Sequence, residues 1–124
     1  MREVEAYKSD KPVWRGMFFK SEKQSQKFID DLRKNNLSVN GAAMSTSKSL
    51  RVAAKFAMTR GYRGYPLMVK IVGHKNGRDF EPLALFKNEK EVLFLKGSKF
   101  KLVGYGQLQM KNGNVFNRII LEEI

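Results

Sequence analysis

The sequence predicts a single domain of the α+β class, with helices in the first half of the chain and strands mainly in the second. Helical periodicity follows Ser21 and again covers residues 48–60, whereas most strand-like apolar runs lie after residue 66. A hydrophobic fraction of 42%, with 11% aromatic residues, supports a packed core rather than a disordered chain. Helices and strands that separate along the chain in this way are typical of α+β domains.

Length and composition exclude several functional classes. The chain has 124 residues, an ordinary size for one domain, which can bury about two thirds of its unfolded surface. It has no cysteine, which excludes disulfides and thiolate metal sites, and its one histidine, His74, argues against a zinc site or a Ser-His-Asp triad. It shows no apolar run of membrane-spanning length and no secretory signal, so we expect it in the cytoplasm of the producing or target cell.

The net charge of +12, from 24 Lys and Arg against 12 Asp and Glu, is large for a protein of 14.3 kDa. Such a charge favours an anionic partner: nucleic acid, an acidic protein face or a phosphorylated ligand. A solvated lysine surface that keeps the protein soluble explains the same charge equally well. Net charge alone therefore does not choose between these interpretations.

The first half of the chain begins with a strand and a capped helix. Residues 12–19 are rich in aromatic and apolar side chains, which favours a strand. Ser21 and Gln24 have the spacing of a capping box, with Ser21 as the N-cap and Gln24 reaching back. Asn35-Asn36 ends the helix, whose apolar face consists of Phe28, Ile29 and Leu32.

A second helix is expected over residues 48–60, after a turn at Asn40-Gly41. Ser47 or Ser49 can cap its beginning, and Gly61 can end it. Its core stripe is expected to consist of Leu50, Ala53, Ala54, Ala57 and Met58.

Strands separated by glycine turns are expected in the second half. Turns are expected at Asn76-Gly77, at Gly97 and at Asn112-Gly113, where the last hairpin closes. The expected strands cover residues 66–73, 91–96, 99–105, 107–110 and 115–121.

Three short polar patches carry the candidate chemistry, and the first is Arg15-Gly16. Arginine offers a rigid fork of donors that matches phosphate geometry. Gly16 lacks a Cβ, so a ligand or a neighbouring strand can come close. The simpler alternative is an arginine on a strand face, followed by a glycine at a bulge.

The second patch, Ser45-Thr46-Ser47, lies between a short strand and the second helix. Its hydroxyls can cap the helix or orient a buried carboxylate, and capping alone is the simpler explanation. On the helix that follows, Phe56 lies off the core stripe, on the same side as Val52 and Arg60. The ring can therefore form the wall of a ligand site, or it can pack against the sheet.

The third patch, Glu89-Lys90-Glu91, opens a strand. If Glu89 is already extended, residues two apart point to the same face, so both carboxylates face one cleft. The alternative is a pair of solvated glutamates among lysines.

In this order and context, the three patches resemble the signatures of the Arg-Ser-Glu mono-ADP-ribosyltransferases, in the Glu-x-Glu variant found among bacterial toxins and phage proteins. The resemblance runs from Val13 to Tyr105, and residues 91–102 are similar to the family's strand after its catalytic glutamate. It implies an α+β domain with a split two-sheet β core and flanking helices. Many members carry a helical lobe before the first arginine, so residues 1–124 are expected to be a minimal catalytic domain or a fragment without that lobe.

The resemblance implies transfer of ADP-ribose from NAD to an acceptor, with release of nicotinamide and without a metal. Glu91 is then the catalytic carboxylate, which stabilises the positive charge that builds on the nicotinamide ribose. Ser45 supports Glu91, and Glu89 engages the acceptor and helps to remove its proton. The residues implied in NAD binding are Arg15, Gly16, Ser45, Thr46, Phe56 and Arg60.

The same resemblance gives individual roles to aromatic and basic residues around the patches. Phe56 would stack on nicotinamide and Arg60 would contact phosphate, as a similar pair does in the toxins. Phe86 would be the aromatic residue of an acceptor-recognition turn over residues 86–88. Ala42 departs from the pattern, because some toxins place there an asparagine that touches NAD.

A protein arginine is the first choice of acceptor, since a Glu-x-Glu pair goes with arginine acceptors in this family. The expected partner is an acidic or nucleic-acid-associated host protein. ADP-ribosylation of nucleic acid is an alternative that the charge favours. Two further alternatives are a degenerate fold kept for assembly, as in a phage particle, and a non-catalytic domain that binds nucleic acid through Phe18, Phe19, Tyr62 and Tyr65.

Overall fold

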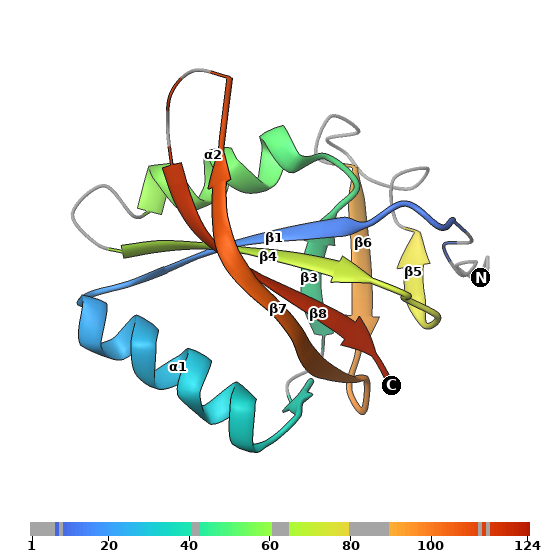
Figure 1. Cartoon of the computed structure of the whole chain (residues 1–124). Coiled ribbons are helices and arrows are strands. Elements are labelled where there is room, and N and C mark those ends of the chain that lie inside the picture. Colours follow the sequence, from blue (N-terminus) through green and yellow to red (C-terminus); the bar gives the residue numbers. More distant parts are fainter. Residues whose placement is uncertain are drawn as a thin grey trace.

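The computed structural model describes residues 7, 9–40, 43–60, 65–79, 90–111, 113 and 115–124, with the backbone alone for Thr59 and Arg60. Within these residues the chain forms two helices and eight strands (Figure 1). The helices are α1 (Glu22–Lys34) and α2 (Leu50–Arg60). The strands are β1 (Val13–Phe19), β2 (Leu37–Ser38), β3 (Ala43–Ser47), β4 (Tyr65–Val72), β5 (Gly77–Asp79), β6 (Glu91–Leu95), β7 (Lys99–Gln109) and β8 (Val115–Glu123). Both helices precede the long C-terminal strands, which confirms the α+β class.

The described strands form a sheet in the order β2-β7-β8-β4-β1-β3-β6-β5. In the middle of this sheet, the pairing between β1 and β3 consists of a single residue pair. β1 pairs with β4 along its whole length, but it pairs with β3 only at Trp14 and Ser47. Phe94 of β6 and Phe100 of β7 come from strands far apart in the order, yet their rings meet edge to face at 5.1 Å between centroids. The sheet therefore turns at the β1–β3 junction, and its two parts pack over a shared core. This is the split two-sheet core that the sequence predicts.

The shared core is closed by α1, which begins and ends as the sequence predicts. The Ser21 hydroxyl accepts a hydrogen bond from the Gln24 backbone, and the Gln24 side chain reaches back to the Lys20 N–H. Asn35 is the C-cap of the helix. The buried residues of this cluster are Val13, Ile29, Leu32, Val39, Leu67, Val69, Ile71, Val92, Phe94, Phe100, Ile119 and Leu121.

Helix α2 lies on β1 so closely that only glycine fits beneath it. A Cβ on Gly16 would lie 2.0 Å from the Ala53 carbonyl oxygen and 2.9 Å from the Ala57 nitrogen. The close neighbour that Gly16 admits is thus a helix rather than a strand, and no bulge interrupts the β1–β4 register. Ala53 and Ala57 are buried in a second cluster with Met68 and Phe116.

The prediction of Met58 in the core stripe of α2 is wrong, because its side chain is 42% exposed. Successive helical residues turn by about 100°, which places Met58 roughly 90° from the centre of the alanine stripe. The small alanines set α2 directly on β1, so only a narrow side of the helix is covered. The helix begins at Leu50, and the Ser49 hydroxyl accepts the Val52 N–H as its cap.

Three predictions about strands also need correction. The patch Ser45-Thr46-Ser47 lies within β3 rather than between a short strand and the second helix. Gly77 belongs to β5, which the sequence did not reveal, rather than to a turn. The turn precedes it, where the Glu123 carboxylate accepts the backbone N–H groups of Lys75 and Asn76. The expected strands 99–105 and 107–110 form one strand, β7, whose pairing with β8 is irregular between Leu102 and Gly104.

Gly97 lies in the turn between β6 and β7, as predicted, with a φ of 99° that favours glycine. Residues 41, 42 and 61–64 lie outside the described residues, so the predictions for Gly41, Ala42, Gly61 and Tyr62 are not tested. No helix within the described ranges is long and apolar enough to cross a membrane.

Candidate active site

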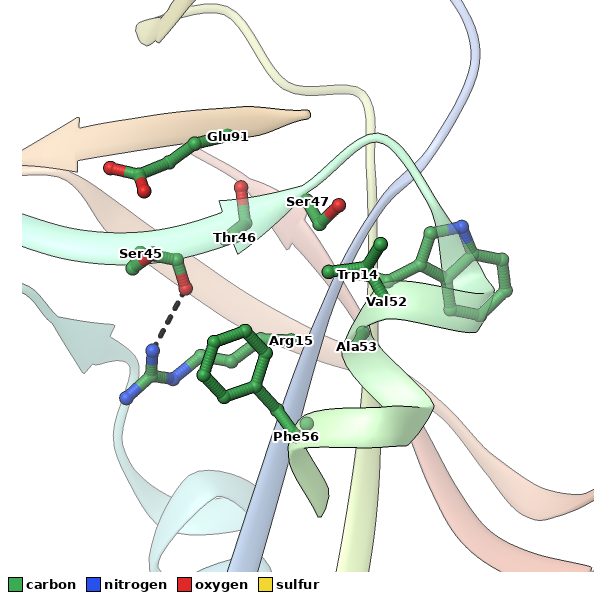
Figure 2. Close-up of a pocket in the computed structure, with 10 residues that line it drawn as sticks. Trp14, Arg15, Ser45, Thr46, Ser47, Val52, Ala53, Phe56 and Glu91 are labelled. Carbon is green, nitrogen blue, oxygen red and sulfur yellow. Dashed lines mark hydrogen bonds between the residues drawn. The ribbon is translucent and has the colours of Figure 1, made fainter. Parts of the chain in front are cut away.

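Residues from each of the three polar patches line one pocket, where β1, β3, β6 and α2 come together (Figure 2). Arg15 reaches it from β1, Ser45 from β3, Phe56 from α2 and Glu91 from the start of β6. The cavity has a volume of about 130 Å³. Its lining consists of Trp14, Arg15, Gly16, Ser45, Thr46, Ser47, Val52, Ala53, Phe56 and Glu91.

Strand register decides which residues of the serine patch share a face with Glu91. In the antiparallel pairing of β3 with β6, Ser47 lies directly opposite Glu91 and Thr46 lies opposite Val92. Since side chains alternate along a strand, Ser45, Ser47 and Glu91 point to one face and Thr46 to the other. The Thr46 hydroxyl is buried and donates a 2.6 Å hydrogen bond to the Val92 carbonyl.

Arg15 is a partly buried cation held by the backbone of the serine patch. Its Nη1 donates a 2.8 Å hydrogen bond to the Ser45 carbonyl oxygen (Figure 2). Burial lowers the pKa of the Arg15 guanidinium from its ordinary value, although arginine stays protonated at neutral pH. Within the described part of the chain, no carboxylate lies within ion-pair distance of Arg15. An anionic group of a ligand would complement this charge.

Phe56 forms an apolar wall of the pocket. Its side chain is 50% exposed, and it lines the same pocket as Arg15 (Figure 2). Val52 lies one helical turn earlier and lines the same cavity. The ring is therefore available to a ligand, which argues against the alternative that it is packed away against the sheet.

Several predicted site residues lie outside what the structure describes. Glu89 and Phe86 fall within residues 80–89, and the side chain of Arg60 is likewise not described. Lys90 has a φ of 49°, in the left-handed region, and β6 begins only at Glu91. Strand alternation therefore does not extend back through Lys90, so it gives no support to a common face for Glu89 and Glu91.

Four lining residues are not among the predicted site residues: Trp14, Ser47, Val52 and Ala53. Ser47 belongs to the second patch and lies two residues from Ser45, so the two share one face of the strand. Trp14 lines the pocket because β1 and β3 meet at Trp14 and Ser47, a tertiary pairing with no local signature. Among the described residues, the Ser45 hydroxyl makes no hydrogen bond to Glu91, so its support of Glu91 stays a prediction.

The fold is that of ADP-ribosyltransferases of known structure. The chain is similar to Vis toxin, an ADP-ribosyltransferase from Vibrio splendidus, with 18% identity and a TM-score of 0.59 over 94% of this chain and 49% of that one. It is also similar to exoenzyme S from Pseudomonas aeruginosa, with 20% identity and a TM-score of 0.59 over 90% of this chain and 47% of that one. The ATR domain of Salmonella SpvB matches with 17% identity and a TM-score of 0.61 over 95% of this chain and 64% of that one.

The chain spans about half the length of the Vis and exoenzyme S chains that it matches. No protein-family model matches the sequence, and no curated protein matches it. At 17–20% identity, these likenesses establish the fold, and the chemistry has to be argued from the pocket itself.

Proposed function

We propose that this chain transfers ADP-ribose from NAD to an acceptor and releases nicotinamide. The observation that carries the proposal is the meeting of Arg15, Phe56 and Glu91 in one pocket of an ADP-ribosyltransferase fold. NAD carries two phosphates, a cationic ring and a ribose between them. The pocket offers a cation, an aromatic wall and a carboxylate, which match the phosphates, the ring and that ribose in turn.

Glu91 is the catalytic carboxylate in this proposal. Cleavage breaks the bond between nicotinamide and ribose, and the electron pair of that bond leaves with the ring. Positive charge then builds on the ribose, and a carboxylate held beside it stabilises the oxocarbenium-like transition state. Ser47, directly opposite Glu91 on β3, places a hydroxyl on the same face as the carboxylate.

Arg15 and Phe56 hold NAD in this proposal. The Arg15 guanidinium binds a phosphate or ribose oxygen, and its hydrogen bond to the Ser45 carbonyl keeps it beside the strand that pairs with β6. The exposed Phe56 ring stacks on nicotinamide. Gly16, Ser45 and Arg60 complete the proposed NAD-binding set. Thr46 also lines the pocket, but its hydroxyl donates to the Val92 carbonyl and is not assigned to NAD. Exoenzyme S, one of the similar structures, was solved bound to carba-NAD.

A protein arginine is the proposed acceptor, with Glu89 and Phe86 as the residues that recognise it. The Glu-x-Glu spacing of Glu89 and Glu91 supports this choice through the family resemblance. Vis was solved in complex with agmatine, a small molecule that carries a guanidinium group like that of arginine. A protein that presents such an arginine on an acidic surface would suit the net charge of +12.

Labelled NAD tests this proposal. The protein is incubated with NAD labelled in its ADP-ribose part and a host-cell lysate, and the product is divided between protease and nuclease digestion. We expect label in macromolecules that protease releases and nuclease does not, together with free nicotinamide. Label released by nuclease alone would move the acceptor to nucleic acid, and an absence of free nicotinamide would refute the transferase.

A further inference from the structure

Glu91 lies on one face of a three-stranded unit, and the residues behind it lie on the other. β6 is flanked by β3 and β5, and Val92 lies opposite both Thr46 of β3 and Asp79 of β5. Since side chains alternate along strands, this row points away from the face that carries Ser47 and Glu91. The back face of the unit is its core side, where Val92 is fully buried and Thr46 is 4% exposed, so contacts there can restrain β6 from the side opposite Glu91.

An ion pair crosses this back face. Lys48 follows the end of β3, and its Nζ donates a 2.8 Å hydrogen bond to Asp79 Oδ2 of β5. β6 lies between these two strands, so the ion pair spans the start of β6. The two side chains are only 21% and 23% exposed, so solvent and salt screen this ion pair less than they screen a pair on the surface. Lys48 Nζ also lies 4.7 Å from the centroid of the Tyr7 ring.

The backbone of Lys48 restrains the residue just before Glu91. Its N–H donates a 2.9 Å hydrogen bond to the Lys90 carbonyl, one step beyond the pair of Ser47 with Glu91. Lys90 has a φ of 49°, a left-handed conformation that a residue with a Cβ adopts at a cost. Such a conformation persists where surrounding contacts fix it, and the bond from Lys48 is one such contact.

We infer that Lys48 and Asp79 are positioning residues, whose ion pair across the back of β6 fixes Glu91 for catalysis. The role assigned to Glu91 rests on the proposed function. Glu91 follows a left-handed residue bonded to Lys48 and precedes Val92, whose carbonyl accepts from Thr46. If the ion pair is removed, residues 90–92 can shift, although every side chain that lines the pocket is still present. A displacement of about 1 Å at a reacting group can cost ~100-fold in rate.

The central variant is Lys48→Met, which removes the charge and retains a chain of similar length and the backbone N–H. We expect kcat for NAD cleavage to fall about tenfold, because Glu91 should move by less than the ~1 Å that costs ~100-fold in rate. The KM for NAD should stay unchanged within about twofold. Lys48→Arg retains a cation that can reach Asp79 and should recover most of the loss. Asp79→Asn, a second and isosteric variant, should lower kcat in the same way.

The matched control is Lys101→Met, which breaks the exposed pair of Lys101 with Glu122 at 3.4 Å between Nζ and Oε1. It makes the same substitution at a lysine of β7 whose ion pair is with β8, so kcat should stay at the wild-type value. Because Lys48 and Asp79 share this ion pair, the double variant Lys48→Met with Asp79→Asn should lose much less than the product of the two single losses. Losses that multiply, or an equal loss in Lys48→Arg, would overturn the inference.

Backbone hydrogen exchange separates this inference from the proposed function. In Lys48→Met the amides of Val92 and Phe94 should exchange about tenfold faster than in Lys101→Met, because a local restraint has been removed. A wild-type protein that does not cleave NAD refutes the proposed function, and the exchange rates alone then decide whether the pair fixes β6. Unchanged exchange, or a raised KM with intact kcat, contradicts the positioning role.

Discussion

Arg15 and Glu91 reach one pocket from strands that do not pair with each other, and Ser45 lies between them. β1 pairs with β4 and β3, whereas β6 pairs with β3 and β5. The Ser45 carbonyl accepts from Arg15. The three patches could be recognised in the sequence because their residue types and order are distinctive. The hydrogen bond from Arg15 to the Ser45 carbonyl could not be predicted from the sequence, because a backbone carbonyl has the same chemistry at every position.

Arg15→Lys should weaken NAD binding although it keeps the charge. Lysine cannot reproduce the planar fork that reaches both the Ser45 carbonyl and a ligand oxygen. A lost charge-assisted hydrogen bond of about 1.5 kcal/mol corresponds to roughly tenfold in Kd, which calorimetry can measure. Arg33→Lys is the matched control, because it makes the same substitution on α1, outside the pocket lining, and should leave the Kd for NAD unchanged. Equal NAD affinity in wild type and Arg15→Lys would reject the assignment.

At the scale of elements, the sequence predicts the long and well-capped pieces and misses the short ones. The capping box of α1 and the apolar run of β1 are local signals, and both are confirmed. β5 has three residues, Gly77–Asp79, too few to show a period. Gly104 and Gly106 interrupt the apolar pattern of β7, so the sequence predicts two strands there. Pairing with β8 nevertheless continues across both glycines. Pairing partners distant in sequence decide both cases.

Gly16→Ala should destabilise the fold by separating α2 from β1. The new Cβ would meet the Ala53 carbonyl oxygen at 2.0 Å, and backbone on both sides cannot yield cheaply. Overpacking of this kind costs about 1–3 kcal/mol or more, measured as a lower free energy of unfolding in urea. Gly106→Ala is the matched control, because its Cβ would meet only the far end of the Arg118 side chain, Nη2, at 3.4 Å. Equal losses in the two variants would show that α2 does not lie on β1 this closely.

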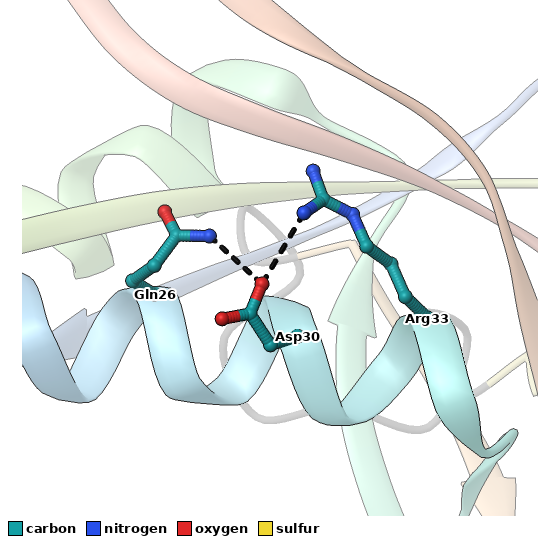
Figure 3. A network of polar contacts seen from close by, with 3 residues as sticks. All are labelled: Gln26, Asp30 and Arg33. Atoms are coloured by element: carbon teal, nitrogen blue, oxygen red, sulfur yellow. Dashed lines mark hydrogen bonds and ion pairs between the residues drawn. The ribbon is translucent and has the colours of Figure 1, made fainter.

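At the scale of the whole molecule, charge is distributed unevenly between the helices. Asp30 of α1 accepts hydrogen bonds from Gln26 and Arg33, so a local carboxylate partly balances the cations there (Figure 3). Helix α2, beside the pocket, contains Arg51, Lys55 and Arg60 and no acidic residue. Composition alone gives the net charge of +12, but only the fold shows which helix lies beside the candidate site.

The net charge should produce weak, salt-dependent binding of single-stranded oligonucleotides. Contacts to phosphates release counterions, so affinity should fall steeply between about 50 and 200 mM salt, as followed by fluorescence anisotropy. The contacts are spread over the surface, so Arg15→Lys should change this affinity less than about twofold. Salt-resistant binding that depends on Arg15 would instead favour nucleic acid as the acceptor.

The central proposal is that Glu91 is the catalytic carboxylate for NAD cleavage. The most direct test is to measure nicotinamide release by the purified wild-type and Glu91→Gln proteins. The amide keeps the shape of the carboxylate and loses the charge that stabilises the oxocarbenium-like transition state. We expect Glu91→Gln to keep the wild-type fold by circular dichroism and the wild-type NAD affinity within a few fold. Nicotinamide release should fall by about 10²–10³-fold. A folded Glu91→Gln protein that releases nicotinamide at the wild-type rate would contradict the claim.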